Sequence, residues 1–359
     1  MDRTLILRST HLQLNASLGT RAGAELVLGY GDVATEYGAL LETAGLADRS
    51  HRAILRVAGP EAKVFLHGLV TNDVKGVPPG RGNYTAVVNA RGKMLGDGRL
   101  LVRSDEELLL DLEPESHEQM LAHLDQHLIS EDCMLQDLTG ALAILGVYGP
   151  AARTVMELAI GVFPETSAPF QHHTIQLAGT EAVIVAAAPA GIEGFELLFN
   201  ADIAETVWAA LVEASRGAGG TMVGDEALDA ARIHRVVPRY GAEMNDATIP
   251  LEANLEAAIS YTKGCYVGQE VIAKATYRGR VRRKMGQLEV PPGTRPGASL
   301  VDEERVVGTI ASVLDPDPAG GAALALAYLR PELLVIGGKV GIEGGGEAEV
   351  RWAPPPKEG

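Results

Sequence analysis

The chain has 359 residues, 46 % of them hydrophobic and 22 % charged, which is typical of a globular protein with two or three domains. Its formal net charge of −16 makes broad electrostatic binding of nucleic acid unfavourable, although a local basic patch could still act. The two cysteines, Cys133 and Cys265, lie far apart in the sequence, which argues against a disulfide framework and against a self-sufficient zinc or iron–sulfur ligand set, and we expect no metal site.

No apolar run approaches the ~18 residues that span a membrane, and the first residues lack the pattern of a secretory signal. We therefore expect a cytoplasmic protein with no membrane partner.

Residues 1–30 are weakly patterned and are expected to form a loosely held arm. Asp32 is a favourable N-cap for a helix that carries apolar residues as far as Ala44. The alternating segment 52–57 predicts a half-buried strand, and a helix is expected to start at Gly59-Pro60.

An internal repeat follows. Residues 53–62 (AILRVAGPEA) and 143–152 (AILGVYGPAA) share seven of ten positions at an offset of 90. Each copy precedes three predicted strands and a helix, near 82–89, 93–102, 107–112 and 114–127 in the first half and near 173–178, 181–187, 194–199 and 202–214 in the second. This β-α-β-β-β-α order predicts a duplicated α+β unit, with a crevice between the halves where a ligand could bind.

The last third of the chain differs from the two repeats in its composition and predicted secondary structure. A helix is predicted at 224–235, an irregular segment at 238–262 and a short helix at 269–274. From Arg282 onward, short β-branched runs separated by Gly and Pro predict a small β-barrel or sandwich with a disordered Pro-rich tail. The expected domains are 1–139, 140–275 and 276–359.

The octapeptide 263–270, KGCYVGQE, has an unusual mixture of residues for a packing segment. Cys265 lies near the cation Lys263 and before a possible helix N-terminus, and both would stabilise a thiolate. The alternative is a buried, inert cysteine. Cys133, at the start of a predicted core strand, is interpreted as inert.

Asp97 lies in a predicted strand between two glycines, where an acid needs either a hydrogen-bond partner or a ligand. The alternative is a solvent-facing acid beside Arg99. His123 and His127 have the i, i+4 spacing of a metal pair but no third ligand at a diagnostic distance, which favours a solvated helix face.

One dense basic run could hold carboxylates, phosphates or RNA, or could be an alternating solvated strand; it consists of Arg278, Arg280, Arg282, Arg283 and Lys284. The sequence has no Walker loop, no GxGxxG after a strand and no GxSxG elbow, which argues against the common nucleotide, flavin and hydrolase sites.

The octapeptide resembles the KGCYxGQE signature of the YgfZ family, folate-binding proteins related to the glycine-cleavage T-protein (aminomethyltransferase) and to mitochondrial iron–sulfur assembly factors. The octapeptide is highly specific, whereas the other similar stretches are shared with the T-protein. The resemblance covers roughly residues 45–350, through segments at 67–74, 84–97, 194–196, 231–233, 249–252 and 308–312.

The resemblance implies a three-domain cloverleaf around a central cavity for tetrahydrofolate or a related reduced folate, with a C-terminal β-barrel. It places Asp97 beside the reacting nitrogen of the pterin and Arg232 at the carboxylate tail of the folate, with Tyr84 and Asn89 in the cavity-lining stretch. Cys265 would be the reactive thiol facing the folate, in a loop completed by Lys263, Gly264, Tyr266, Gly268, Gln269 and Glu270.

Two departures from the T-protein pattern affect this expectation. Ile192 stands where the T-protein has a glutamate that grips the pterin, and Gly96-Asp97 replaces a paired Asp-Asp. We therefore expect a folate-binding protein that supports iron–sulfur cluster assembly or repair, and through it tRNA modification, with iron–sulfur enzymes or assembly proteins as partners. The alternatives are an aminomethyltransferase of the glycine-cleavage type and a non-catalytic scaffold for RNA or protein, of which direct RNA binding is not favoured.

Overall fold

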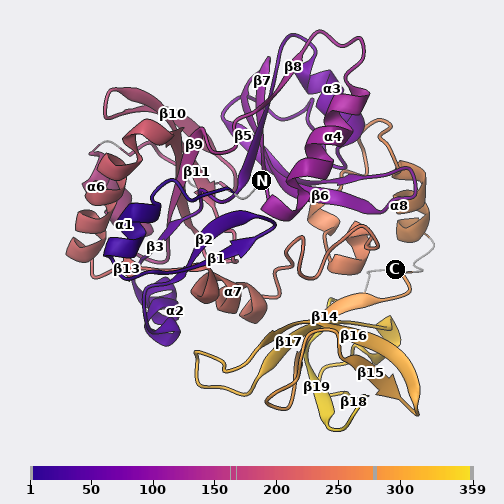
Figure 1. The fold of residues 1–359 in the computed structure, drawn as a ribbon. Helices are drawn as coiled ribbons and strands as arrows, with labels where there is room; N and C mark the ends of the chain where they lie inside the picture. Colours follow the sequence, from indigo (N-terminus) through magenta and orange to yellow (C-terminus); the bar gives the residue numbers. More distant parts are fainter. Residues whose placement is uncertain (1–2, 162, 167, 278–280, 356–359) are drawn as a thin grey trace.

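The computed structural model describes residues 3–161, 163–166, 168–277 and 281–355. Two mixed α+β halves lie side by side, and a C-terminal barrel lies beneath them in the view of Figure 1. The α+β class and the C-terminal barrel predicted from the sequence are confirmed. No helix in the described part of the chain combines the length and apolar character needed to cross a membrane.

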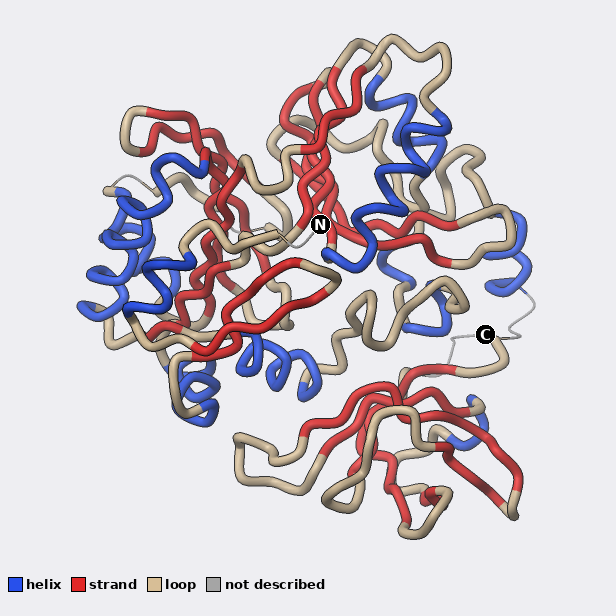
Figure 2. Tube along the Cα trace, viewed as in Figure 1, coloured by secondary structure: helices blue, strands red, loops and turns tan. Residues whose placement is uncertain are grey.

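The first half contains a five-stranded antiparallel sheet with the strand order β5-β6-β7-β4-β8. Helices α3 (Ala62–Leu69) and α4 (His117–His127) pack on it through one shared apolar core, and Figure 2 shows them beside the sheet. The strands are β4 (Ala53–Ala58), β5 (Arg81–Val88), β6 (Met94–Ser104), β7 (Glu107–Leu112) and β8 (Met134–Asp137).

The second sheet repeats this arrangement in the order β10-β11-β12-β9-β3-β13. Its first four strands correspond one by one to β5-β6-β7-β4, as the predicted duplication requires. Helices α5 (Ala152–Ile160) and α6 (Ala204–Gly217) pack on it. The strands are β3 (Gly45–Asp48), β9 (Leu142–Tyr148), β10 (His172–Leu177), β11 (Thr180–Ala187), β12 (Gly194–Asn200) and β13 (Thr221–Met222).

The two halves exchange a strand. β3 comes just before β4 in the chain but pairs with β9 of the second sheet, whereas β8 comes just before β9 and pairs with β4 of the first sheet. Residues 1–139 are expected to form the first repeat, yet β3 within this range joins the second sheet. Hydrophobic alternation does not reveal which sheet a strand joins. As a result of the exchange, the connection 49–52 crosses from one half to the other.

The N-terminal segment is not the loosely held arm that we expect from the sequence. It forms α1 (Arg8–Gln13), the hairpin β1 (Ser17–Arg21) and β2 (Ala24–Gly29), and α2 (Val33–Glu42), for which Asp32 is the N-cap as predicted. Leu5, Leu7 and His11 are buried, and His11 Nε2 lies 2.8 Å from an Asp48 carboxylate oxygen on β3. The prediction fails because these contacts join segments distant in sequence, so no local period marks them.

The remaining elements follow the predictions closely. Helices α7 (Asp225–His234) and α8 (Gln269–Tyr277) are present, and the segment between them contains only short 3-10 helices. The predicted disordered tail includes residues 356–359, which lie outside the described residues. The short helices are η1 (Pro114–Ser116), η2 (Ala201–Ile203), η3 (Pro250–Ala253), η4 (Glu256–Ala258) and η5 (Pro331–Leu333).

The C-terminal domain is a closed barrel with the strand order β14-β17-β16-β15-β18-β19 and its own apolar core. The strands are β14 (Lys284–Glu289), β15 (Ser299–Asp302), β16 (Arg305–Leu314), β17 (Leu324–Leu329), β18 (Lys339–Ile342) and β19 (Glu347–Trp352). Gln287 of the barrel donates a hydrogen bond of 2.7 Å to the Ile233 carbonyl, which fixes the barrel against α7.

Candidate functional site

A cavity of about 880 Å³ lies between the two halves. Its volume is within the range of roughly 300–1,000 Å³ that is usual for small-molecule sites. Strands β6 and β12, the crossing connection 49–52, helix α7 and the segment 235–240 all contribute to its wall. The cavity therefore forms where the strand exchange brings both halves together.

Asp97 lies on this wall, in β6, and only 3 % of its surface is exposed. The Tyr84 hydroxyl donates a hydrogen bond to Asp97 Oδ2, whereas Oδ1 has no hydrogen-bond partner among the described residues. Burial raises the pKa of Asp97 to about 7, against the hydrogen bond from Tyr84, which lowers it. The alternative of a solvent-facing acid is wrong, and the carboxyl is suited to exchange a proton near neutral pH.

The glycines on either side of Asp97 have a steric role. A Cβ at Gly98 would lie 2.4 Å from the Asp111 carbonyl oxygen, and one at Gly96 would lie 2.8 Å from Ser116 Cβ. Only glycine allows β6 to approach its neighbours this closely. The Gly-Asp-Gly pattern thus comes from tight packing around a buried acid.

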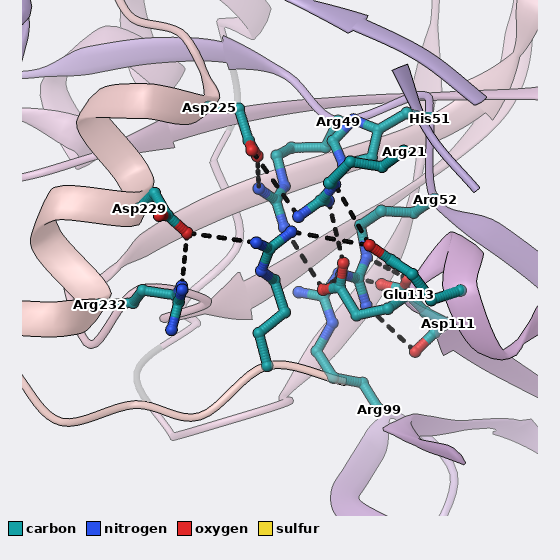
Figure 3. Close-up of polar contacts among 12 residues, drawn as sticks. Arg21, Arg49, His51, Arg52, Arg99, Asp111, Glu113, Asp225, Asp229 and Arg232 are labelled. Atoms are coloured by element: carbon teal, nitrogen blue, oxygen red, sulfur yellow. Dashed lines mark hydrogen bonds and ion pairs between the residues drawn. The ribbon is translucent and has the colours of Figure 1, made fainter. Parts of the chain in front are cut away.

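Arg52, Arg99 and Glu113 of the cavity wall belong to a network of buried ion pairs, part of which Figure 3 shows around Arg52, Asp111 and Glu113. Arg52 Nε donates to Asp111 Oδ1 at 2.5 Å, and Arg99 contacts both Asp111 and Glu196 of β12. Arg52 also contacts Glu113. Burial opposes the ionisation of Glu113, but the guanidinium groups of Arg52, Arg21 and Arg49 outweigh it and hold its pKa below the ordinary value.

The N-terminal hairpin supplies a further part of the wall. Arg21, at the end of β1, donates to Glu113 at 3.1 Å and lies 3.7 Å from Asp225 on α7. Arg49 lies 3.9 Å from the same aspartate. Neither arginine is among the site residues predicted from the sequence. The available signal was the dense charge of Arg49-Ser-His-Arg52 directly before a predicted strand.

Arg232 is on the cavity wall as the resemblance implies, but its guanidinium group is already engaged. It donates to Asp229 at 2.6 Å and to both oxygens of Glu243 at 2.9 Å. These contacts tie α7 to the segment that follows it, so a ligand carboxylate would compete with two protein carboxylates.

Asn89 does not line the cavity with Tyr84 and Asp97. It lies in the turn between β5 and β6, where its side-chain oxygen accepts hydrogen bonds from the backbone N–H groups of Arg91 (2.9 Å) and Lys93 (3.2 Å). Its contacts are those of a turn-forming residue.

In the octapeptide loop, residues 263–270, the ammonium group of Lys263 forms its hydrogen bonds with backbone carbonyl groups and not with the Cys265 thiol. Its Nζ donates to the carbonyl oxygens of His67 (2.6 Å), Val70 (2.6 Å) and Asn72 (3.0 Å), which follow or end α3. Burial lowers the pKa of Lys263 to about 8. The ammonium group also lies 4.9 Å from the ring centre of Tyr266, which is buried.

The rest of the octapeptide loop is arranged around a tight backbone contact. Gly268 has a φ of 81°, and a Cβ there would lie 2.4 Å from the Asn89 carbonyl oxygen. Gln269 donates to the Gly264 carbonyl at 3.5 Å, and exposed Glu270 pairs with Lys274. These contacts order the octapeptide loop without reaching the cavity.

Cys265 is exposed and is not part of the cavity wall, so the structure does not bring it together with Asp97. The expectation that this thiol faces the folate site is therefore not met. Cys133 is half-buried just before the edge strand β8, and burial raises the pKa of its thiol, which suits an inert cysteine.

Two other predictions from the sequence concern the basic run and a metal site. Within the basic run, Arg283 pairs with Glu252 at 3.1 Å and Lys284 with Glu256 at 2.5 Å, whereas Arg278 and Arg280 lie outside the described residues. No group of three or more His, Cys, Asp or Glu side chains that could hold a metal ion occurs within residues 3–161, 163–166, 168–277 and 281–355.

Comparison with known proteins gives a consistent set of similarities. The family model described as "GCVT N-terminal domain" matches residues 7–263. The chain is 29 % identical to a protein named aminomethyltransferase from Thermotoga petrophila, over 93 % of this chain and 91 % of the relative. It is also 29 % identical to the protein of that name from Rubrobacter xylanophilus, over 98 % and 91 %.

A solved structure has the same fold. It is the glycine cleavage system aminomethyltransferase T from Bartonella henselae, with a TM-score of 0.87, 24 % identity, and coverage of 98 % of this chain and 96 % of that one.

Proposed function

The chain belongs to the GCVT N-terminal domain family, and from this premise we propose that it is a folate-dependent transferase of aminomethyl-type one-carbon groups. The observation that carries the proposal is the buried carboxyl of Asp97, which has one oxygen held by Tyr84 and the other without a partner on the cavity wall. The relatives named aminomethyltransferase, which align over more than nine-tenths of the chain, support the same reaction.

The cavity fits a reduced folate in volume and in chemistry. An unpartnered carboxylate oxygen can accept a hydrogen bond from a ring or amine N–H, and the arginines of the wall suit an anionic tail. Tetrahydrofolate would supply the amine that accepts the carbon. Asp97 would take or hold the proton at Oδ1, and its pKa of about 7 is well placed for general base chemistry.

Ile192 affects the strength of folate binding that we expect. It lines the cavity and packs in an apolar cluster with Leu40, Tyr148 and Leu228. Where the resemblance expects a glutamate, this wall offers no hydrogen-bond acceptor from the side chain. We therefore expect weaker folate binding than in relatives that carry the acid.

The test is folate-dependent release of ammonia from an aminomethyl-lipoyl carrier. Asp97→Asn should lower the rate by roughly 10²–10⁴-fold, the usual effect of losing a positioned general base. Cys265→Ala, outside the cavity, is the matched control and should keep the wild-type rate. Undiminished activity in Asp97→Asn, or no binding of tetrahydrofolate by the wild-type chain, would refute the proposal.

The exposed octapeptide thiol supports a second candidate function, a role in iron–sulfur cluster assembly or repair and, through it, tRNA modification. Cys265 is accessible to a partner protein, not to a ligand in the cavity. Complementation of an iron–sulfur-deficient strain tests this role, and full rescue by Cys265→Ala would remove the thiol from it. A direct RNA scaffold is less well supported because Arg283 and Lys284 are paired with acids of the chain itself.

A further inference from the structure

Four arginines of the cavity wall keep buried N–H groups that nothing in the described part of the chain accepts. One is Nη1 of Arg99, whose guanidinium group already contacts Asp111 and Glu196. The others are Nε of Arg21, Nε of Arg49, and both Nε and Nη1 of Arg239. Arg49 is 95 % buried, since only 5 % of its surface is exposed. Buried donors without partners are unfavourable, so a preformed set of them on a cavity wall indicates a ligand with acceptor oxygens.

The contrast with the neighbouring arginines is clear in the distances. Arg52 and Arg232 reach acids at 2.5 and 2.6 Å, which are tight hydrogen bonds. Arg49 reaches Asp225 only at 3.9 Å, and Arg239 reaches Asp229 at 3.4 Å and Glu115 at 3.8 Å. The first group of arginines is committed to the protein, whereas the second group retains hydrogen-bonding capacity.

The three guanidinium groups surround one part of the cavity. Arg21 and Arg49 both lie near Asp225, as Figure 3 shows, and Arg21 and Arg239 both lie near Glu115. Burial raises the pKa of Asp225 and of Glu115 above their ordinary values.

We propose that Arg21, Arg49 and Arg239 form a subsite for a carboxylate or phosphate group. The subsite is distinct from Arg232, whose guanidinium group is occupied by Asp229 and Glu243. Its anion has two possible sources, the tail of a folate, which rests on the proposed function, or a separate small anionic substrate. Bidentate binding by planar guanidinium groups suits either source.

Inorganic phosphate is the first probe, measured by titration calorimetry on the full chain. Arg239→Gln should weaken phosphate binding by about tenfold or more, because charged hydrogen bonds are lost, and Arg239→Lys should restore part of it. Arg103→Gln is the matched control, since Arg103 pairs with exposed Glu181 away from the cavity, and should bind like wild type. Equal phosphate affinity in Arg239→Gln and wild type, or no phosphate binding by wild type, would overturn the proposal.

Arg239 makes no short side-chain hydrogen bond that a substitution would break, so this variant should fold, and Arg49→Gln gives an independent second variant. Two further compounds decide which source supplies the anion: 5-formyltetrahydrofolate and its analogue without the glutamate, 5-formyltetrahydropteroate. If Arg239→Gln loses affinity tenfold for 5-formyltetrahydrofolate but not for 5-formyltetrahydropteroate, the subsite binds the folate tail. If the variant loses affinity for phosphate but for neither pterin compound, the subsite binds a separate substrate. Binding of phosphate but of neither pterin compound to wild type would refute the proposed function and leave the subsite standing.

Discussion

The cavity and the octapeptide loop satisfy their polar groups in opposite ways. In the octapeptide loop, Lys263 gives its hydrogen bonds to three backbone carbonyls, and Gly268 is fixed by contact with the Asn89 carbonyl. In the cavity, Asp97 and Arg49 keep buried atoms without partners. The polar groups of the octapeptide loop are thus paired within the protein, whereas the cavity retains unpaired ones. This difference supports the proposal that a ligand binds at the cavity, and it gives the octapeptide loop a structural role together with an accessible thiol.

Glu113→Gln should have the largest effect on stability, because it breaks the cavity network. Removing one partner of a buried ion pair typically costs about 3–5 kcal/mol, and Glu113 contacts Arg52 and Arg21. Urea unfolding measures the loss. Since the folded-state pKa of Glu113 is lowered, its contribution is present above the ordinary pKa of 4.5 and should disappear as pH falls below it.

Glu107→Gln is the control for this prediction. Glu107 pairs with Arg56 at 2.9 Å, but both side chains are about one-third exposed, so the variant should lose no more than about 1 kcal/mol. Equal losses in the two variants would show that the buried network does not hold the halves together.

Lys263→Met should have the next largest effect on stability, and it tests the contacts of the octapeptide loop. The substitution leaves three carbonyl oxygens without their donor, and we expect a loss of about 2–3 kcal/mol in the free energy of unfolding. Lys274→Met makes the same change at an exposed i, i+4 pair with Glu270 and should cost about 0.5 kcal/mol or less. If Lys263→Met were as mild as its control, the carbonyl contacts would not stabilise the octapeptide loop.

The two regions also differ in what the sequence could reveal. The octapeptide is conspicuous because Lys263, Gly268 and their contacts lie within or near one short segment. Asp97 was found for a similar local reason, an acid in a strand between glycines. Arg21, Arg49 and Glu113 meet only after the N-terminal hairpin docks and the halves exchange β3 and β8. No local pattern encodes such long-range pairing, which is why the predicted loose arm supplies part of the cavity wall instead.

Tyr84→Phe should change the pH dependence more than the stability. The Tyr84 hydroxyl stabilises the ionised form of Asp97, so its loss raises the pKa of Asp97 above the value of about 7 in the wild type. If the carboxylate is the active form, the rise of activity with pH should shift to higher pH, while stability falls by about 1 kcal/mol. The pH–rate profile measures the shift, and Tyr266→Phe, at a tyrosine of the octapeptide loop, provides the comparison. If the pH–rate profile of Tyr84→Phe were the same as that of the wild type, Asp97 would not be the titrating group.

Cys265→Ala should have the smallest effect, because the side chain is exposed and outside the cavity. We expect a change in the free energy of unfolding within about 0.5 kcal/mol, as for most surface substitutions, and unchanged folate affinity. A maleimide reagent should label the wild-type thiol in the presence of saturating tetrahydrofolate as fast as in its absence, since the two sites are separate. Protection of the thiol by tetrahydrofolate would show that ligand binding moves Cys265 toward the cavity, whose wall does not include it in this structure.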